Sequence, residues 1–441
     1  MTRRLSAPRL IALGFAALMG LGTLLLKLPA STQEGISWVD AFFVSVSAVS
    51  VTGLSSVNFP ATFTTFGSAV VMLLIQVGGL GIMTFTTLGA LFVGRRVGFR
   101  GLLAAREELG SIDSPRNTLR LVGQIAGITL LVEALGAAVL AAGFIRGGLG
   151  YGEGLFQGAF HAVMAFCNSG FATLPGRDLA SYAGDAAVNL ALIALIILGG
   201  FGFPVLVNLY HYRQARRLTL HSRLVLVTTA ALVLVGFLSV ALLEWNNLAT
   251  LGGNPVGTRL WMSLFQAVTP RTAGFATVDY AQMRDPTLFL QIGLMFIGTA
   301  PTSTGGGIKV TTLALLVLVV VAQVRGQEEG VSAFGRRVPQ QLIQKAFAVL
   351  SLSALLVVTA TLALMVSDSL ALLPAIFEAT SAFGTVGLSM NVTPELSLFG
   401  KLLIAGVMFL GRVGPITLIL ALSARQKTRG YVYPQEDIAI G

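Results

Sequence analysis

The stretch SAFGTVGLS (381–389) closes a short apolar segment with small residues that surround Gly387. The same ending occurs three more times along the chain. Aligned on the glycine, the four copies read VTGLS (51–55), NSGFA (168–172), TAGFA (272–276) and TVGLS (385–389), and the glycines are 117, 104 and 113 residues apart. Such recurrence along the chain indicates an internal repeat of one structural unit.

A second motif follows each copy at a matched distance. GGLGIM (78–83), GGFGFP (199–204), the loop from Gly298 and GRVGPI (411–416) begin 25, 29, 24 and 24 residues after the aligned glycine. Each unit therefore contains a span, a short re-entrant helix, a glycine-bearing strand and a second span. We place the four repeats at residues 1–110, 111–218, 219–330 and 331–441, the last one including the C-terminal tail.

The composition is that of a membrane protein. The chain is 54% hydrophobic and only 11% charged, whereas soluble domains carry about 25% charged residues. Apolar stretches near the length of about 20 residues that spans a bilayer as a helix occur at 9–29, 64–93, 117–145, 187–209, 222–243, 287–322, 342–366 and 398–424. The alternating pattern of a β-barrel is absent. We expect an all-α membrane protein with four covalently linked span–pore helix–filter–span repeats around a pseudo-fourfold pore.

The basic residues are distributed unevenly between the loops. Of the 29 lysines and arginines, 20 lie near the two termini and in alternate loops. This asymmetry predicts that both termini and the basic loops face the cytoplasm. It also explains the net charge of +10 without a nucleic-acid partner. A single cysteine excludes an intrachain disulfide framework, and the three histidines show no metal-binding spacing.

The four glycine-bearing strands are candidates for an ion filter. Backbone that is not helical survives at membrane depth only where protein buries it or where it lines a watery cavity. Four such strands can direct carbonyl oxygens inward and replace the hydration shell of an ion. Glycine is needed where φ is positive or where a side chain would block the strand. The candidate filter residues are Val51, Thr52, Gly53, Asn168, Ser169, Gly170, Thr272, Ala273, Gly274, Thr385, Val386 and Gly387.

The polar loop GTAPTSTGGGIKVTT (298–312) interrupts an apolar segment. It is not a Walker A loop, because Ile308 separates the last glycine from Lys309 and Val310 follows the lysine. Its length exceeds that of a helix kink, and the flanks 287–297 and 313–322 are each too short to span. A discontinuous helix of this kind is typical of a functional midplane. We expect a gate below the filter, with candidate residues Thr302, Ser303, Thr304, Gly305, Gly306, Gly307 and Lys309.

Arg412 is the predicted companion of this loop. In the aligned motif its position is occupied by Gly79 and Gly200, so the guanidinium is expected to face the axis. A charge at this depth is costly and usually functional. We interpret it as a fixed positive charge that opposes cation flow and bonds to the gate loop. A structural arginine tied to helix carbonyls is the alternative. Lys309 either snorkels to the cytoplasmic side or closes its own loop. The roles of Glu133, Arg271 and Glu378 are left open.

These motifs resemble those of the Trk/Ktr/HKT superfamily of potassium transporters, most closely the membrane subunits of bacterial Ktr systems. The resemblance rests on SVTGLS, FCNSGFATLPG, FQAVTPRTAGFAT, APTSTGGGIK, SAFGTVGLS and FLGRVGPITL and covers essentially the whole chain. It implies a homodimer in the bacterial inner membrane, with one pore per subunit and a cytosolic ring of nucleotide-binding regulatory subunits beneath it. It also implies K⁺ as the transported ion, held by filter carbonyls, and no organic cofactor. Glycine at all four filter positions matches the potassium-selective pattern of the superfamily, and whether Na⁺ activates transport is not decided by the sequence.

Two other classes of function can be weighed against this interpretation. A sodium-coupled secondary transporter also uses broken helices, but it predicts an inverted or twofold repeat instead of four parallel copies. An intramembrane enzyme needs a nucleophile beside a base. His161 and Cys167 stand six residues apart on one short helix and therefore on different faces. We expect no enzymatic activity.

Overall fold

The computed structural model describes residues 7–81, 115–174, 179–326 and 330–414, and most of these residues are helical. The predicted repeat boundary at 110 and the C-terminal tail lie outside the described residues. Four long helices carry the first span of each predicted repeat: α1 (Ala7–Leu26), α7 (Pro115–Arg146), α12 (Leu220–Glu244) and α16 (Gln340–Ser367). Among the described helices, these four are long and apolar enough to cross a bilayer without a break.

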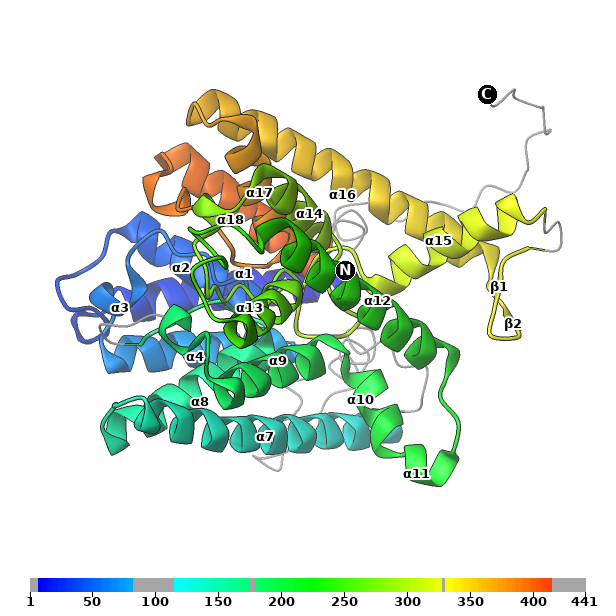
Figure 1. Cartoon of the computed structure of the whole chain (residues 1–441), viewed down its shortest axis with the longest axis horizontal. Coiled ribbons are helices and arrows are strands. Elements are labelled where there is room, and N and C mark those ends of the chain that lie inside the picture. Colours follow the sequence, from blue (N-terminus) through cyan, green and yellow to red (C-terminus); the bar gives the residue numbers. More distant parts are fainter. Residues whose placement is uncertain (1–6, 82–114, 175–178, 327–329, 415–441) are drawn as a thin grey trace, which may run out of the picture.

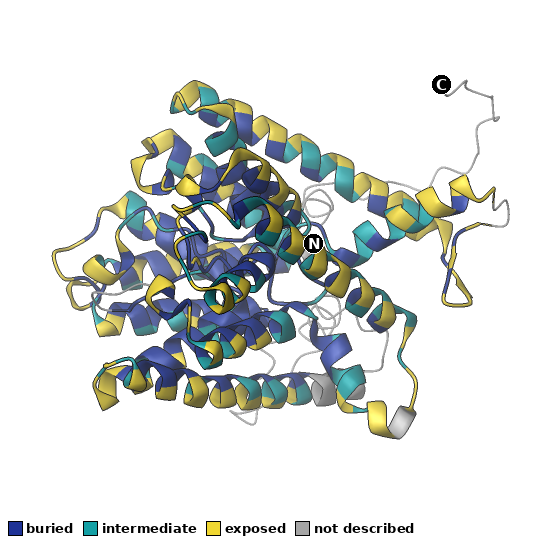
Figure 2. Cartoon of the chain, viewed as in Figure 1, coloured by how far each residue is buried: buried dark blue, intermediate teal, exposed yellow. Residues whose placement is uncertain are grey.

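In Figure 1, the long helix α7 lies along one edge of the molecule and α16 along the opposite edge, with shorter helices between them. The outward faces of the long helices carry large apolar side chains. Leu130 and Leu131 of α7 are 63% and 62% exposed. In water such a surface would be a liability, but in lipid it is the face that meets the acyl chains. The burial pattern therefore agrees with the multi-pass membrane protein expected from the composition (Figure 2).

Four short helices occupy the predicted re-entrant segments. They are α2 (Trp38–Ser50), α8 (Tyr151–Cys167), α13 (Val256–Val268) and α17 (Leu372–Gly384). Each is followed by backbone of the same non-helical shape. In all four copies, the residue two positions before the aligned glycine has a left-handed conformation. These residues have φ between 48° and 69°, although none is a glycine: Val51, Asn168, Thr272 and Thr385. Left-handed backbone is uncommon outside glycine, so its recurrence at one position is strong structural support for the repeat.

In each second span a helix ends at the level of the second motif. The described helices of these spans are α4 (Thr65–Leu80), α9 (Ala186–Gly200) with α10 (Phe203–Tyr210), α14 (Asp285–Phe296) with α15 (Val310–Val324), and α18 (Leu398–Val413). The continuous span expected at 187–209 is wrong, since α9 and α10 meet at 104°. The break lies at Gly202, whose φ is +80°, and a Cβ there would lie 2.6 Å from the carbonyl oxygen of Pro301.

A glycine with the same positive φ also ends α4 and α18, beyond which the chain lies outside the described residues. Gly81 follows α4 with φ +87°, and Gly414 follows α18 with φ +86°. Each of these glycines is the last one of its GxxG motif, three residues after the first. The first glycine has a different role: a Cβ on Gly78, for example, would lie 2.1 Å from the carbonyl oxygen of Val49 at the end of α2. The motif thus combines a close packing contact with a helix break.

The four short helices, which we call pore helices after the sequence prediction, contact the second spans in cyclic order. Besides contacts within its own repeat, α2 packs on α18, α8 packs on α4, α13 packs on α9, and α17 packs on α14. Each pore helix therefore touches the second span of the preceding repeat, and repeat 1 touches repeat 4. The remaining elements are short: η1 (Pro29–Ser31), α3 (Phe59–Thr62), η2 (Leu179–Tyr182), α11 (Tyr212–Ala215), η3 (Tyr280–Gln282), η4 (Thr393–Glu395), β1 (Ser332–Ala333) and β2 (Arg336–Arg337).

The strands β1 and β2 form an antiparallel hairpin, with Ser332 opposite Arg337, that projects beside the far end of α15 (Figure 1). Buried side chains gather where the four short helices α2, α8, α13 and α17 end. Phe166 of α8 and Phe383 of α17 are at most 1% exposed there. The core of the protein therefore surrounds the four glycine-bearing strands.

Candidate functional site

The four aligned glycines meet in a closed ring. A Cβ atom placed on Gly53 would lie 2.2 Å from the amide nitrogen of Gly170, and one on Gly170 would lie 2.8 Å from the Cα of Gly274. A Cβ on Gly274 would lie 3.1 Å from the Cα of Gly387, and one on Gly387 would lie 3.2 Å from the Cα of Gly53. Segments more than a hundred residues apart thus come together at one point, with no room for a side chain.

Backbone carbonyl groups take part in this ring. The carbonyl oxygen of Thr52 would lie 2.3 Å from a Cβ on Gly387, and that of Val386 would lie 2.2 Å from a Cβ on Gly274. The pore helices α2, α8 and α17 end within three residues of the ring, and α13 ends six residues before it. Helix C-termini carry partial negative charge. The ring is therefore a place where a cation is electrostatically favoured over an anion.

Serine side chains of the preceding helices hold the strands of repeats 1 and 4 by hydrogen bonds. The amide of Gly53 donates to Ser47 Oγ at 3.0 Å, and the amide of Gly387 donates to Ser381 Oγ at 3.2 Å. The two serines stand six residues before their glycines. In repeats 2 and 3, Ser169 Oγ and Thr272 Oγ1 are buried without a hydrogen-bond partner among the described residues. Two polar atoms next to the ring therefore have unused capacity for water or an ion.

A polar side chain of the pore helix also holds the strand beyond each glycine. In repeat 1, Ser56 Oγ donates to Asp40 Oδ1 at 2.7 Å. In repeat 2, Thr173 Oγ1 donates to Gln157 Oε1 at 2.7 Å, and Gln157 Nε2 donates back to the Thr173 carbonyl at 2.9 Å. Both pairs join the positions 13 residues before and 3 residues after the glycine. The sequence alone did not reveal that these two positions pair, because the paired residue types differ between copies.

Repeats 3 and 4 make equivalent braces from other positions. Gln266 Nε2 donates to Thr277 Oγ1 at 2.9 Å. Ser389 Oγ donates to Glu378 Oε2 at 2.8 Å, and the other carboxylate oxygen accepts from Thr393 Oγ1. Glu378 is fully buried. Its contacts therefore favour a role in holding the strand over direct attraction of cations at an outer mouth.

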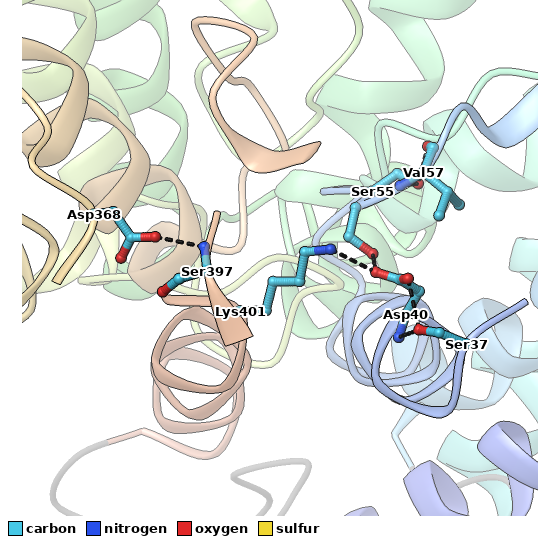
Figure 3. Close-up of polar contacts among 8 residues, drawn as sticks. Ser37, Asp40, Ser55, Val57, Asp368, Ser397 and Lys401 are labelled. Carbon is cyan, nitrogen blue, oxygen red and sulfur yellow. Dashed lines mark hydrogen bonds and ion pairs between the residues drawn. The ribbon is translucent and has the colours of Figure 1, made fainter. Parts of the chain in front are cut away.

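The brace of repeat 1 extends to repeat 4 (Figure 3). Asp40 accepts from Ser37 Oγ at 2.6 Å and pairs with Lys401 Nζ at 2.8 Å. Lys401 lies on α18, so this ion pair joins the pore helix of repeat 1 to the second span of repeat 4. Nearby, Asp368 accepts from the amide of Ser397 at the start of α18. Burial raises the pKa of the Asp368 carboxyl, but hydrogen bonds from Ser367 and Ser397 outweigh this effect and hold the pKa below its usual range.

We expect Asp40→Ala to lower the free energy of unfolding by about 1–3 kcal/mol, because it removes a partly buried ion pair and two hydroxyl partners. The measurement is the thermal unfolding midpoint of the purified protein in detergent. Glu395→Gln, an exposed carboxylate of η4, is the matched control and should leave the midpoint unchanged. Equal midpoints for both variants would show that the brace contributes nothing to stability.

The interrupting loop lies directly against the ring. A Cβ on Gly305 would lie 2.0 Å from Thr272 Oγ1, and the amide of Gly306 donates to Thr385 Oγ1 at 2.9 Å. Gly307 has φ +69°, and a Cβ there would lie 3.3 Å from the Cα of Gly384. The three glycines of the loop are therefore packed under the ends of the strands of repeats 3 and 4. The structure ends the loop earlier than expected, since α15 begins at Val310 and residues 310–312 are helical.

The first half of the loop binds repeat 2. Thr304 Oγ1 donates to the carbonyl of Phe166 at 3.1 Å, and the amide of Phe203 donates to the carbonyl of Thr302 at 3.2 Å. Ser303 Oγ stays within the loop and donates to the carbonyl of Ala300 at 2.6 Å. These contacts explain the bend between α9 and α10, because the loop occupies the space that a straight helix would fill.

Arg412 connects the loop to repeat 1. One guanidinium nitrogen donates to the carbonyl of Thr304 and another to the carbonyl of Gly78, with Gly79 O at 3.3 Å from the second. Arg412 therefore makes the contacts expected from both interpretations. It bonds to the loop, and it also bonds to helix carbonyls as a structural arginine would. With the loop contacts to repeats 2, 3 and 4, the arginine completes a layer that touches all four repeats beneath the ring.

Two further cations hold the loop. Lys309 Nζ donates to the carbonyl of Gly305 at 2.7 Å and lies 3.5 Å from that of Gly306, so the ammonium closes its own loop instead of snorkelling. Arg271 is buried. Its guanidinium contacts Thr229 and the carbonyl of Gly298, each at 3.5 Å. Arg271 thus links α12 to the beginning of the loop.

A small polar cluster lies behind the layer. Glu133 of α7 is 6% exposed, and its Oε2 accepts from Gln76 Nε2 at 3.2 Å. Cys167 Sγ lies 3.5 Å from Gln76 Oε1, and it is packed against Gly79. Glu133 therefore joins α7 to α4 at Gln76. Gln76 is two residues before Gly78, whose carbonyl accepts from Arg412. Among the described residues, no group of three His, Cys, Asp or Glu side chains could hold a metal ion.

Comparisons with known proteins agree with this architecture. The cation transport protein family TrkH matches residues 14–429. The chain is 39% identical to the Ktr system potassium uptake protein B of Bacillus subtilis, over 99% of this chain and 97% of the relative. It is 36% identical to the potassium/sodium uptake protein NtpJ of Enterococcus hirae, over 100% and 98% of the two chains. The crystal structure of the potassium transporter TrkH from Vibrio parahaemolyticus covers 96% of this chain and 86% of its own, with a TM-score of 0.75 and 21% identity.

Proposed function

The chain belongs to the TrkH family of cation transport proteins, and from this premise we propose that it is the potassium-translocating membrane subunit of a bacterial K⁺ uptake system. It is a transport protein and not an enzyme. The observation that carries the proposal is the closed ring of Gly53, Gly170, Gly274 and Gly387 at the ends of four pore helices. The names of the relatives, which are potassium uptake proteins, support K⁺ as the ion.

In this proposal the four strands are the selectivity filter of one pseudo-fourfold pore. Carbonyl oxygens such as those of Thr52 and Val386 replace the water around a K⁺ ion. The negative ends of the pore helices lower the energy of the cation at the ring. The braces behind the strands keep the carbonyl positions fixed, so that a smaller ion is not accommodated equally well. Conduction is channel-like, because the ion passes between the carbonyl oxygens of the four strands and the strands keep their conformation.

The loop between α14 and α15 is the gate of this pore. Its glycine segment is packed against Thr272 and Thr385, so it occupies the route that an ion must take after leaving the ring. Arg412 adds a fixed positive charge at the same level. Its hydrogen bonds to the loop and to the end of α4 hold the closed arrangement. Opening requires the loop to leave the axis, which breaks these bonds.

The opening force comes from other subunits. We assign the protein to the bacterial inner membrane as a homodimer, with both termini on the cytoplasmic side. A cytosolic ring of nucleotide-binding regulatory subunits controls the gate from that side. The basic loops give this surface a positive field, which favours docking of partners with acidic or mixed surfaces.

A sodium-coupled secondary transporter is the second candidate, and the name of the Enterococcus relative, a potassium/sodium uptake protein, favours it. The two candidates differ in what drives the ion. A channel-like subunit passes K⁺ down its own gradient, whereas a coupled transporter needs Na⁺ on the same side. The cyclic contacts of four repeats and the closed glycine ring favour the channel-like mechanism.

The test is ion flux through the purified protein in liposomes. We expect K⁺ uptake down a K⁺ gradient with no Na⁺ gradient, and little Na⁺ flux when Na⁺ replaces K⁺. Matched liposomes without protein measure the leak. Uptake that stops when the Na⁺ gradient is removed would support the coupled transporter, and equal K⁺ and Na⁺ fluxes would contradict the filter.

A further inference from the structure

A cavity of about 370 Å³ lies between α12, α15 and α16, away from the ring and the gate contacts. Its walls come from the first turns of α12 and α15 and from the start of α16. The lining residues are Leu220, His221, Leu224, Thr311, Thr312, Leu315, Arg337, Val338, Pro339, Leu342, Lys345, Ala346 and Val349. None of them contacts the glycine ring, so the cavity is not part of the ion path described above.

The cavity combines an apolar wall with a group of cations. Leucine, valine, proline and alanine side chains form more than half of it, while Arg337 and Lys345 supply two positive charges. Within the described part of the chain, no carboxylate pairs with either cation, and none lines the cavity. His221 also faces it, and its Nε2 is buried with no hydrogen-bond partner in the same part of the chain. Positive charge and an unused polar atom thus stand at a hydrophobic pocket.

These features select an amphiphile with an anionic head and an apolar tail. The cavity lies where the long helices α12 and α16 begin, next to basic loops that are expected to face the cytoplasm. Basic pockets between membrane helices on that side suit phosphate head groups of lipids. We propose that this cavity binds one anionic phospholipid of the inner leaflet. Arg337 and Lys345 hold the phosphate, His221 lies within the head-group region, and an acyl chain packs along Leu224 and Leu315.

The position of the cavity connects the lipid to the gate. Thr311 and Thr312 lie in the first turn of α15, directly after Lys309, whose ammonium binds Gly305 and Gly306. A lipid in the cavity therefore contacts the helix that carries one end of the loop, and it restrains the movement of that helix. This second step rests on the proposed function of the loop, whereas binding of the lipid does not.

The experiment is native mass spectrometry of the purified protein in nanodiscs of phosphatidylcholine with or without phosphatidylglycerol. We expect one phosphatidylglycerol to be retained in preference to phosphatidylcholine. In Arg337→Gln/Lys345→Gln the affinity should be about 30-fold lower, because each cation near a lipid surface contributes about a fivefold preference. The control pair is Arg336→Gln/Arg325→Gln, two exposed arginines that do not line the cavity, and it should retain the lipid.

A second variant tests binding of the acyl chain of the lipid without changing the charge of the cavity. Ala346 is buried at the wall, and Ala346→Phe fills the cavity, so it should also lose the lipid. Equal retention in the cavity variants and the control, or equal retention of the two lipids, overturns the proposal. A loss of dimer with no change in lipid count would show that the cavity is instead a contact between two copies of the chain.

The link to the gate is read from K⁺ flux in liposomes of the same two compositions. We expect phosphatidylglycerol to change the flux of the unmodified protein and not that of Arg337→Gln/Lys345→Gln. Lipid loss without a change in flux contradicts the link to the gate and leaves the binding site supported. Absence of K⁺ flux in every protein, with the lipid still retained, contradicts the proposed function and not the lipid site.

Discussion

Gly53→Ser is expected to abolish selective K⁺ uptake, and Gly387→Ser is expected to do the same. Both glycines have positive φ, +97° and +94°. A side chain in the left-handed region costs about 1–2 kcal/mol for most residues. The steric problem is larger, because the new Cβ would overlap the backbone of Gly170 in one case and of Thr52 in the other. Backbone atoms cannot move aside as a flexible side chain can, so the ring must open or shift.

The consequence of a shifted ring is a loss of the carbonyl positions that replace the water around K⁺. We expect K⁺ flux, or its preference over Na⁺ flux, to fall about tenfold or more, since every 1.4 kcal/mol corresponds to a factor of ten. Uptake is measured in liposomes with protein amounts matched. The control is Gly406→Ser in α18, where a Cβ meets no atom within 4 Å. Unchanged selectivity in both filter variants would contradict the assignment of the ring.

Removing the gate is expected to raise K⁺ flux in the absence of the regulatory subunits. Deletion of residues 303–307 takes away the glycine segment that lies against Thr272 and Thr385. Arg412→Ala removes the positive charge and the hydrogen bonds to Thr304 and Gly78. The two changes act on one layer of contacts. Combined in one protein, they should therefore increase the flux by less than the sum of the separate effects.

The fluxes are measured in liposomes and in a strain deficient in K⁺ uptake, with selectivity expected to persist because the ring is intact. Arg213→Ala, an exposed arginine of α11, is the control for loss of one positive charge. Lower flux in both gate variants, while the protein remains folded and dimeric, would show that the loop is an element needed for transport. The gate assignment would then be wrong.

Features that depend on the backbone could be predicted from the sequence. Only glycine fits where four strands meet, so the positions of Gly53, Gly170, Gly274 and Gly387 survive as a visible pattern. The GxxG motif was visible for the same reason. Its last glycine, at Gly202 for example, was not recognised as a helix break, because nothing in the sequence shows that a distant loop occupies the space beside it.

Features that depend on side-chain pairs could not be predicted. The braces join an acid to a hydroxyl in repeat 1 and an amide to a hydroxyl in repeat 2, so no shared residue type marks them. The ion pair of Lys401 with Asp40 joins positions far apart in the sequence, so neither residue marks the other. Glu133 had no assignable partner until the structure placed Gln76 beside it. Such pairs follow from packing between repeats, which one sequence does not reveal.

The most direct test of the account is the position of the permeating ion itself. Rubidium mimics potassium and scatters X-rays anomalously, so crystals of the purified protein grown in Rb⁺ would show where the ion binds. We predict anomalous peaks on the axis of the ring formed by Gly53, Gly170, Gly274 and Gly387, surrounded by carbonyl oxygens and lying on the side of the ring away from Arg412. Peaks found only away from that axis, such as beside Glu133 or Glu378, would contradict the central claim that the ring is the potassium filter.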